Sequence, residues 1–249
     1  MRGVLTDIDD TLTTEGAIPM GVAAALAALR SAGLPVIAVT GRPMGWSRPI
    51  AFETPLAAVV AENGGVALVR EGDALCIDYA DPEPVRAANA VRLREVAERI
   101  VAEVPGATLA RDSAGRVTDI AVDHAEFAHL DAAQIEAVLL RMRAAGMHAT
   151  VSSIHVNGWF GDHTKLTGAR WIVERLLGRD LDAERGEWLY VGDSTNDEPM
   201  FAAFPISVGV ANIVDFADRL QRWPRYVTAL ERGRGFVEVA EALLAARDA

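Results

Sequence analysis

The sequence predicts an α/β fold in which a parallel sheet carries helices on both faces and a second, smaller unit is inserted. Short buried strands alternate with helices over the first eighty residues, and the same alternation returns near residue 160 after a stretch with a different pattern. A chain of 249 residues has room for a domain of ordinary size with a smaller one inserted. We therefore predict a core made of residues 1–80 and 160–249, and an inserted domain over 81–159.

The first part of the core alternates strand and helix. Strands are predicted over 4–8, 34–39 and 57–61, and helices over 19–32 and 46–53. The first helix has Pro19 in its first turn and Gly33 just past its end, as helices commonly do. This order favours a Rossmann-like parallel sheet, in which ligands bind beyond the carboxyl ends of the strands. The turn at 62–65 then leads into an antiparallel pair over 66–69 and 75–79.

The middle stretch begins with the segment DPEP at 81–84. Its predicted elements are helix, strand, helix and strand, over 84–104, 117–122, 131–145 and 147–156. This pattern indicates an α+β domain built on an antiparallel sheet. Beyond it the core resumes with helices over 164–178, 197–203 and 236–246 and strands over 187–191 and 206–209.

Composition argues against several kinds of partner. The formal net charge is −11, from 24 Lys and Arg against 35 Asp and Glu, and no basic tract occurs, so nucleic acid and anionic membranes are poor partners. Cys76 is the only cysteine, which excludes an internal disulfide and suits a reducing compartment. No secretion signal is recognisable, and no stretch has the ~18 apolar residues of a membrane span. We expect a soluble, cytoplasmic monomer or homodimer.

Acidic side chains crowd the end of the first predicted strand, in the segment DIDDTLT at 7–13. Asp7 and Asp9 are two residues apart, so in an extended segment both carboxylates leave on the same face. Their repulsion would raise a pKa or require a cation, and Mg²⁺ is a hard divalent ion that carboxylate oxygens suit. Taken alone, the segment is equally well explained as a solvated acidic loop.

Three further segments bring polar groups to the same edge of the predicted sheet. VTGRP at 39–43 ends a strand with the Thr40 hydroxyl, and free backbone N–H groups there can bind phosphate oxygens. HTKLTGA at 163–169 places Lys165 in the first turn of a helix, where a cation opposes the helix dipole unless an anion also lies there. GDSTND at 192–197 ends another strand with Asp193 and Asp197, although Asp197 could also cap a helix. Together the four segments indicate a metal and phosphate site.

Taken in order, DIDDTLT, TGR, Lys165 and GDSTND resemble the four motifs of the haloacid dehalogenase superfamily of phosphohydrolases. The resemblance covers almost the whole chain. The insertion between the second and third motifs is similar to a type II (C2) cap, and AENGG at 61–65 is similar to what the IIB branch carries. Many relatives have glycine where Asp10 stands, and we interpret Asp10 as a residue that shapes the turn.

The resemblance implies a Mg²⁺-dependent phosphomonoester hydrolase that works through an aspartyl phosphate. Asp7 would be the nucleophile, and Asp9 the general acid and base. Mg²⁺ would bind to a carboxylate oxygen of Asp7, the backbone carbonyl of Asp9 and a carboxylate oxygen of Asp193. Asp197, together with Asn196, would orient Lys165 and metal-bound water. The residues expected to bind the phosphoryl group are Thr40, Gly41, Lys165 and Asn196.

In capped members of the superfamily the insertion selects the leaving group. The segment SSIHVNGW at 152–159 alternates polar and apolar residues, which would put Ser153, His155 and Asn157 on one face of a strand. Such a row suits a polyhydroxylated leaving group, and by analogy with the IIB branch we expect a sugar phosphate or a phosphorylated sugar acid. The residues predicted to contact it are Arg42, Trp46, Arg48, Asn63, Ser153, His155 and Asn157.

Two other functions are left open by the motifs. A phosphosugar mutase, similar to the phosphomannomutases, would share the aspartyl phosphate step and transfer the phosphoryl group to a second sugar hydroxyl. A non-catalytic phosphosugar-binding protein is the other alternative. The presence of both a nucleophile and a general acid, Asp7 and Asp9, argues against a pure binder.

Overall fold

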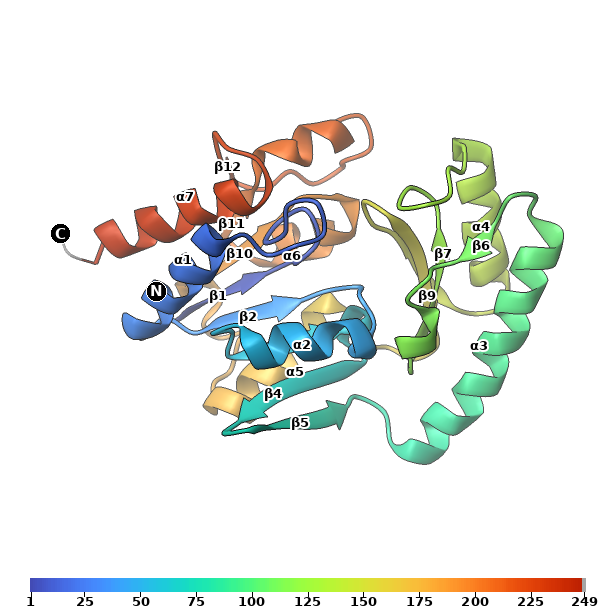
Figure 1. The fold of residues 1–249 in the computed structure, drawn as a ribbon, viewed down its shortest axis with the longest axis horizontal. Helices are drawn as coiled ribbons and strands as arrows, with labels where there is room; N and C mark the ends of the chain where they lie inside the picture. The colour runs from blue at the N-terminus through green and yellow to red at the C-terminus, as the bar shows by residue number, and fades with distance from the viewer. Residues whose placement is uncertain (248–249) are drawn as a thin grey trace.

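The structure, a computed structural model, describes residues 1–247 and contains two separate sheets (Figure 1). Strands β12 to β3 of the larger sheet are parallel, and β4 and β5 pair antiparallel at its edge. The predicted α/β class with a parallel core is therefore confirmed. In spatial order the strands are β12 (Tyr226–Val227), β11 (Ile206–Gly209), β10 (Trp188–Gly192), β1 (Gly3–Thr6), β2 (Val36–Val39), β3 (Ala58–Ala61), β4 (Val66–Glu71) and β5 (Ala74–Tyr79).

Helices cover both faces of the large sheet. On one face Leu26 and Phe236 are fully buried beneath α1 (Met20–Ser31), α2 (Met44–Glu53) and α7 (Arg232–Ala245). On the other face Ile172 and Met200 are buried beneath α5 (Lys165–Leu177) and α6 (Glu198–Ala203). Because the inner strands are buried on both sides, they are continuous apolar runs, as the sequence predicts for a parallel sheet.

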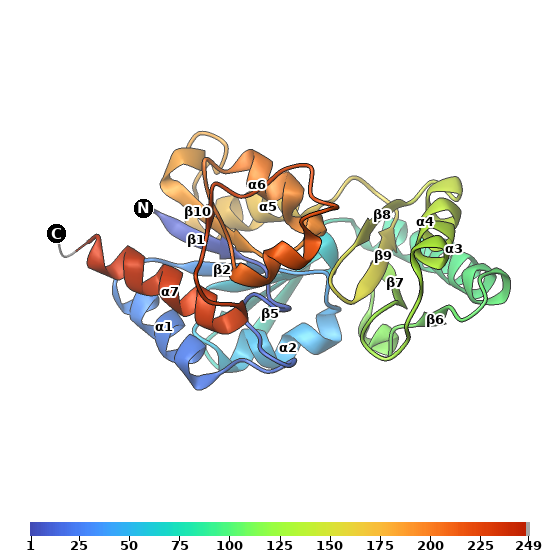
Figure 2. The same cartoon turned by 90° about the horizontal axis from the view of Figure 1, so that it is seen from above.

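The smaller sheet is antiparallel, in the order β6 (Thr108–Leu109), β7 (Asp119–Asp123), β9 (His155–Trp159) and β8 (His148–Val151). Helices α3 (Glu83–Glu103) and α4 (Ala132–Ala144) lie on its outer side, away from the large sheet (Figures 1 and 2). Val122 and Val156 pack against these helices, so alternation turns Asp119, His155 and Asn157 toward the large sheet. The chain enters this unit after β5 and leaves it after β9, and its boundaries at 81 and 159 stay a prediction.

The prediction of one strand over 147–156 is wrong. Two strands, β8 and β9, occupy this region, and residues 152–154 reverse the chain between them. The Ser152 hydroxyl oxygen accepts the N–H of His155 at 3.0 Å, and the N–H of Ser152 donates to the carbonyl of His155 at 2.8 Å. Serine side chains stabilise turns in this way. Ser153 therefore lies in a turn and not on the strand that carries His155 and Asn157.

Helix α7 begins at Arg232, four residues before its predicted start. Gly233 and Gly235 lie in its first turn, where neighbouring chain segments approach closely. A Cβ on Gly233 would be 2.9 Å from the carbonyl oxygen of Leu12, and one on Gly235 would be 2.4 Å from that of Leu230. The two-residue strands β6 and β12 are also absent from the predictions. None of the helices within residues 1–247 is long and apolar enough to cross a membrane.

Candidate active site

The candidate site lies where three neighbouring parallel strands end. Strands β10, β1 and β2 are adjacent in the sheet, so the residues that follow them come together at one edge. The N–H of Asp7 continues the ladder by donating to Val191 at 2.9 Å, and the N–H of Thr40 donates to Val60 at 2.8 Å. Asp7, Thr40 and Asp193 are all buried there.

Lys165, the only lysine in the sequence, holds two of the acidic motifs together. It occupies the first turn of α5, whose start is capped by the Thr164 side chain. Its Nζ lies 2.8 Å from Oδ1 of Asp7 and 2.7 Å from Oδ1 of Asp197. Burial by itself lowers the pKa of Lys165, but Asp197 and Asp7 outweigh burial and raise that pKa above its ordinary value. The lysine is therefore charged and fixed between two carboxylates.

Both carboxylate oxygens of Asp197 accept hydrogen bonds from other groups of the protein. Its Oδ1 also accepts the Tyr190 hydroxyl at 2.5 Å, and its Oδ2 accepts the N–H groups of Asp193 at 2.9 Å and Ser194 at 3.2 Å. Its carboxylate makes no hydrogen bond as N-cap of α6, but its bond to the N–H of Ser194 completes a capping box at the short 3-10 turn Thr195–Asp197, so a capping role coexists with the bond to Lys165. Sequence reasoning missed Tyr190, although a tyrosine inside a buried strand signals a hydroxyl that needs a partner.

Asp7 and Asp193 have carboxylate oxygens that the protein leaves poorly satisfied. Within residues 1–247, Oδ2 of Asp7 has no hydrogen-bond partner, and Asp193 accepts only long bonds, from the Thr11 hydroxyl at 3.3 Å and the Asn212 amide at 3.4 Å. Burial, with neighbouring acids adding to it, raises the pKa of Asp7 to about 7 although Lys165 opposes the shift. Burial and the charges of Asp197 and Asp7 likewise raise the pKa of Asp193 well above its usual range.

A hard cation would relieve this excess of negative charge. Oxygens of Asp7, Asp193 and Asp197 lie within 4.8 Å of one another. Because Asp197 is saturated by other bonds, Asp7 and Asp193 are the carboxylates of this group with oxygens left for a metal, and the predicted ligand set stays a prediction. Carboxylate oxygen donors of this kind suit Mg²⁺. We call Asp7, Lys165, Asp193 and Asp197 the Lys165 cluster.

Of the residues predicted to bind phosphate, Thr40, Gly41 and Asn196 line a small pocket, and Lys165 does not. The Thr40 hydroxyl oxygen accepts the N–H of Arg42 at 3.1 Å, so its proton is free to donate. Gly41 is closely approached by two amides, since a Cβ there would lie 3.3 Å from Oδ1 of Asn157 and 3.4 Å from the Asn63 side chain. The pocket has a volume of about 10 Å³, room for about one water molecule. It is lined by Asp7, Asp9, Thr40, Gly41, Arg42, Ser152, Ser153, Ile154, His155, Asn157 and Asn196.

Asn63 has a buried side-chain amide whose N–H₂ donor is not used. Its side chain is 2% exposed, and its Nδ2 has no hydrogen-bond partner within residues 1–247. Its backbone is left-handed, with φ of 54°, which asparagine tolerates better than most residues. The N–H of Asn63 donates to the carbonyl of Thr40 at 2.9 Å, which fixes the amide beside the predicted phosphate loop.

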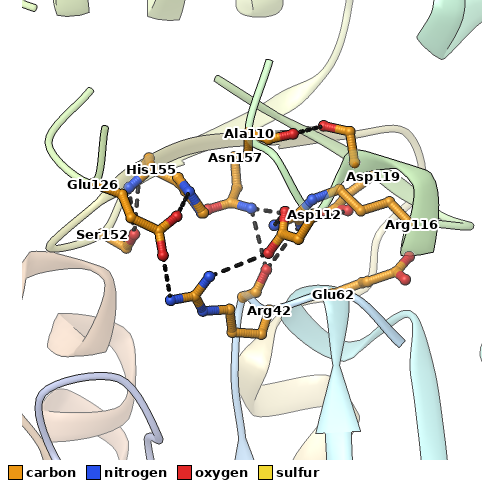
Figure 3. Close-up of polar contacts among 12 residues, drawn as sticks. Arg42, Glu62, Ala110, Asp112, Arg116, Asp119, Glu126, Ser152, His155 and Asn157 are labelled. Atoms are coloured by element: carbon orange, nitrogen blue, oxygen red, sulfur yellow. Dashed lines mark hydrogen bonds and ion pairs between the residues drawn. The ribbon is translucent and has the colours of Figure 1, made fainter. Parts of the chain in front are cut away.

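Arg42 joins the large sheet to the small one (Figure 3). Its Nε lies 2.9 and 3.0 Å from the two carboxylate oxygens of Asp9, Nη1 lies 3.2 Å from Asp112, and Nη2 lies 3.0 Å from Glu126. The guanidinium also lies 4.8 Å from the centre of the Trp46 ring, a cation–π distance. Burial raises the pKa of Asp9, and Arg42 opposes this shift.

Glu126 is shared between Arg42 and His155. Nε2 of His155 lies 3.0 Å from Oε2 of Glu126, while Oε1 accepts from Arg42. Burial, together with the charges of Arg116 and Arg42, lowers the pKa of His155 to about 4. The imidazole is therefore neutral near pH 7 and donates to Glu126 from Nε2. We call Arg42, Asp9, Asp112, Glu126 and His155 the Arg42 cluster.

A second link between the sheets adds Arg116 and Asp119, which no sequence pattern signalled, to the predicted residues Gly41 and Asn157. Nη1 of Arg116 donates to the carbonyl of Gly41 and to both oxygens of Asp119, each at 2.9 Å. Nδ2 of Asn157 donates to the same carbonyl at 3.2 Å and to Asp119 at 3.1 Å. The fully buried Glu62 accepts the N–H groups of Met44, Val117 and Thr118 and the Thr118 hydroxyl.

The structure does not bring every predicted residue to the pocket. Arg48 is exposed on α2 and does not line it. Trp46 packs beneath Arg42 and also lies outside the lining. Asn196 lines the pocket, but its Oδ1 accepts the Ser194 hydroxyl at 2.9 Å, and no hydrogen bond joins it to Lys165 within residues 1–247. Asp10 has a left-handed backbone, with φ of 52°, which gives a physical reason why relatives carry glycine there.

Comparison with known proteins agrees with the fold. A family model of haloacid dehalogenase-like hydrolases matches residues 4–92. The chain is 27% identical over 253 residues to a phosphoglycolate phosphatase of Methanothrix thermoacetophila, covering 99% of this chain and 98% of that protein. Solved structures with the same fold include a Thermoplasma acidophilum protein, 17% identical with a TM-score of 0.73, and a sucrose-phosphatase from Synechocystis sp., 16% identical with a TM-score of 0.68. Each alignment covers 97% of both chains.

Over residues 4–92 the chain is similar to the haloacid dehalogenase-like hydrolases, and over its whole length it is similar to a phosphatase. It is an enzyme of the phosphatase type.

Proposed function

We propose that the protein hydrolyses phosphate monoesters of a small metabolite in a Mg²⁺-dependent reaction through an aspartyl phosphate. The observation that supports this most directly is the Lys165 cluster. One carboxylate oxygen of the buried Asp7 is free while the other is held by Lys165, so one oxygen can attack while the lysine fixes its direction. Positioning and charge stabilisation supply most of the catalysis of phosphoryl transfer.

In the first half-reaction Oδ2 of Asp7 attacks phosphorus, and the bond to the leaving oxygen breaks. Asp9, which lines the same pocket, gives its proton to that oxygen, so the product leaves as a neutral alcohol. In the second half-reaction Asp9 takes a proton from water, whose oxygen attacks phosphorus and frees Asp7. Lys165, the Thr40 hydroxyl and the N–H of Gly41 are the donors that would bind the phosphoryl oxygens throughout.

Asp7 and Asp193, with the carbonyl of Asp9, would hold Mg²⁺. When bound, the ion neutralises charge on the phosphoryl oxygens and on the crowded acids. The raised pKa values of Asp7 and Asp193 support this assignment, because both groups need a positive neighbour to stay ionised near pH 7.

Residues 81–159 would act as the cap. The pocket has room for about one water molecule, so a substrate must enter while the small sheet is displaced from the large one. Ser153, His155 and Asn157 line the pocket from the small sheet, and their polar groups support a sugar phosphate or a phosphorylated sugar acid as substrate. Similarity to a phosphoglycolate phosphatase supports a small phosphorylated metabolite in general.

A screen of phosphorylated metabolites with and without chelator tests the proposal. We expect phosphate release that requires Mg²⁺ and disappears in Asp7→Asn. Conversion of a sugar 1-phosphate to the 6-phosphate without phosphate release would instead identify a mutase. Binding of phosphosugars with neither reaction would identify a non-catalytic binder.

A further inference from the structure

Asp112 and Glu126, in loops that flank the small sheet, face Arg42 across the pocket and bear on the choice of leaving group. We propose that Glu126 and Asp112 select neutral, polyhydroxylated leaving groups and reject leaving groups that bear a carboxylate. This inference rests on the proposed function and narrows it, because it retains sugar and polyol phosphates and removes sugar acids. It sets the chain apart from the similar phosphoglycolate phosphatase, since the leaving group of phosphoglycolate bears a carboxylate.

In this structure the polar groups that face one another across the pocket, from the large sheet and from the inserted unit, are hydrogen-bonded to one another. Arg42 donates to Asp112 and Glu126, and Glu126 also accepts from His155. The remaining volume of about 10 Å³ holds no metabolite. A leaving group must therefore come between Arg42 and the two acids of the small sheet, and it must replace the partners that each side loses.

A hydroxyl group can replace both partners. It donates a proton to a carboxylate and accepts one from a guanidinium, so a diol placed between Arg42 and Glu126 satisfies both. A substrate carboxylate only accepts. It can pair with Arg42, but it then lies against Glu126 and Asp112 with no proton between them.

Local charge also disfavours an acidic leaving group. The single charge of Arg42 is already opposed by the three carboxylates of Asp9, Asp112 and Glu126. Neighbouring Arg116 offers no spare charge, because it pairs with Asp112 and Asp119. His155 is neutral near pH 7, since its pKa is lowered to about 4. A fourth carboxylate would meet repulsion without a free cation, and such juxtapositions suppress wrong partners.

Matched pairs of substrates test this inference. Sorbitol 6-phosphate and 6-phosphogluconate differ by a terminal CH₂OH against a carboxylate, and glycerol 3-phosphate and 3-phosphoglycerate differ in the same way. The measured quantity is the ratio of kcat/KM within each pair. We expect the wild type to favour the alcohol of each pair by at least about tenfold, the size of effect that one well-placed polar contact gives.

Isosteric variants then identify the residues responsible. Glu126→Gln and, separately, Asp112→Asn are expected to lower the alcohol-to-acid ratio about tenfold, mainly by raising kcat/KM for the acids. Glu103→Gln is the matched control, because Glu103 is an acid of the same unit that pairs with Arg141 and is 48% exposed. It should leave both ratios unchanged.

Hydrolysis of p-nitrophenyl phosphate separates the two proposals. If the wild type hydrolyses this ester but prefers the acids, or if both variants keep the wild-type ratios, the inference about Glu126 and Asp112 is overturned while the proposed function stands. If no phosphate ester is hydrolysed, the proposed function fails and the inference fails with it.

Discussion

The Lys165 cluster and the Arg42 cluster are both buried groups of carboxylates around one cation, yet they are built differently. The first gathers acids that follow β1 and β10 around the lysine that begins α5, and in it Asp7 keeps a free oxygen while Asp193 accepts only long hydrogen bonds. The second joins two sheets, and each of the three nitrogens of the Arg42 guanidinium pairs with a different carboxylate. Unused oxygens mark the cluster suited to bind a metal and react, whereas completed pairs mark the cluster that holds the small sheet in place.

The largest expected effect falls on the Lys165 cluster. Asp7→Asn removes the nucleophilic oxygen, and we expect phosphatase activity to fall by at least about 10³-fold, as for nucleophiles that act as part of a unit. The melting temperature should stay within a few degrees of wild type. Asp218→Asn, an exposed aspartate, is the control and should retain full activity. Substantial activity in Asp7→Asn would show that another group attacks phosphorus.

Removing the cation of the same cluster should cost both stability and activity. Lys165→Met leaves Asp7 and Asp197 buried without their shared partner, so we expect the free energy of unfolding to fall by about 3 kcal/mol. Urea denaturation in the presence of chelator measures this loss. Arg99→Met, at an exposed position of α3, should change the stability by less than about 0.5 kcal/mol. Equal stabilities of the two variants would contradict the role given to Lys165.

The contact between the two sheets should depend on charge at Glu62. Glu62→Gln puts an NH₂ group opposite backbone N–H donors in either orientation of the amide, so we expect a loss of about 2 kcal/mol. Glu98→Gln, an exposed change of the same kind, is the control. Limited proteolysis should cut residues 80–82 and 160–164 faster in Glu62→Gln than in wild type. Unchanged cleavage rates would mean that Glu62 does not hold the two sheets together.

The pH dependence of stability should report on Asp119. Burial raises the pKa of Asp119 to about 7 even though Arg116 opposes the shift. The native state therefore binds more protons than the unfolded state between about pH 4 and 7. As the pH rises through this interval, the contribution of Asp119 lowers the free energy of unfolding by at most about 1.4 kcal/mol per pH unit. Asp119→Asn should become more stable relative to wild type across that interval. Urea denaturation at pH 4.5 and at pH 7 measures the difference in unfolding free energy between Asp119→Asn and wild type. The same difference at both pH values would contradict the assignment.

The sequence predicted the fold and the place of the motif residues in it, because each motif follows a recognisable strand or begins a helix. The roles of these residues stay predictions. Asp7, Thr40 and Asp193 come together once a parallel sheet is assumed. Arg42 was expected near the leaving group, but its partners were not, since Asp112 and Glu126 are 70 and 84 residues away and belong to loops without periodicity. The hairpin at 152–154 was missed because alternating polarity continues through it, and only the hydrogen bonds of Ser152 distinguish a turn from a strand.

The pairing of β1 with β10 has a consequence for the order in which the chain folds. Strand β1 is synthesised well before its parallel neighbour β10, which ends at Gly192. Until that point is made, one edge of β1 has no partner, and residues such as Leu5 lack part of the core that buries them. Contacts between such distant residues form slowly and leave apolar surface exposed in the meantime. On the ribosome the catalytic centre is therefore completed late, after the whole unit over 81–159 has emerged.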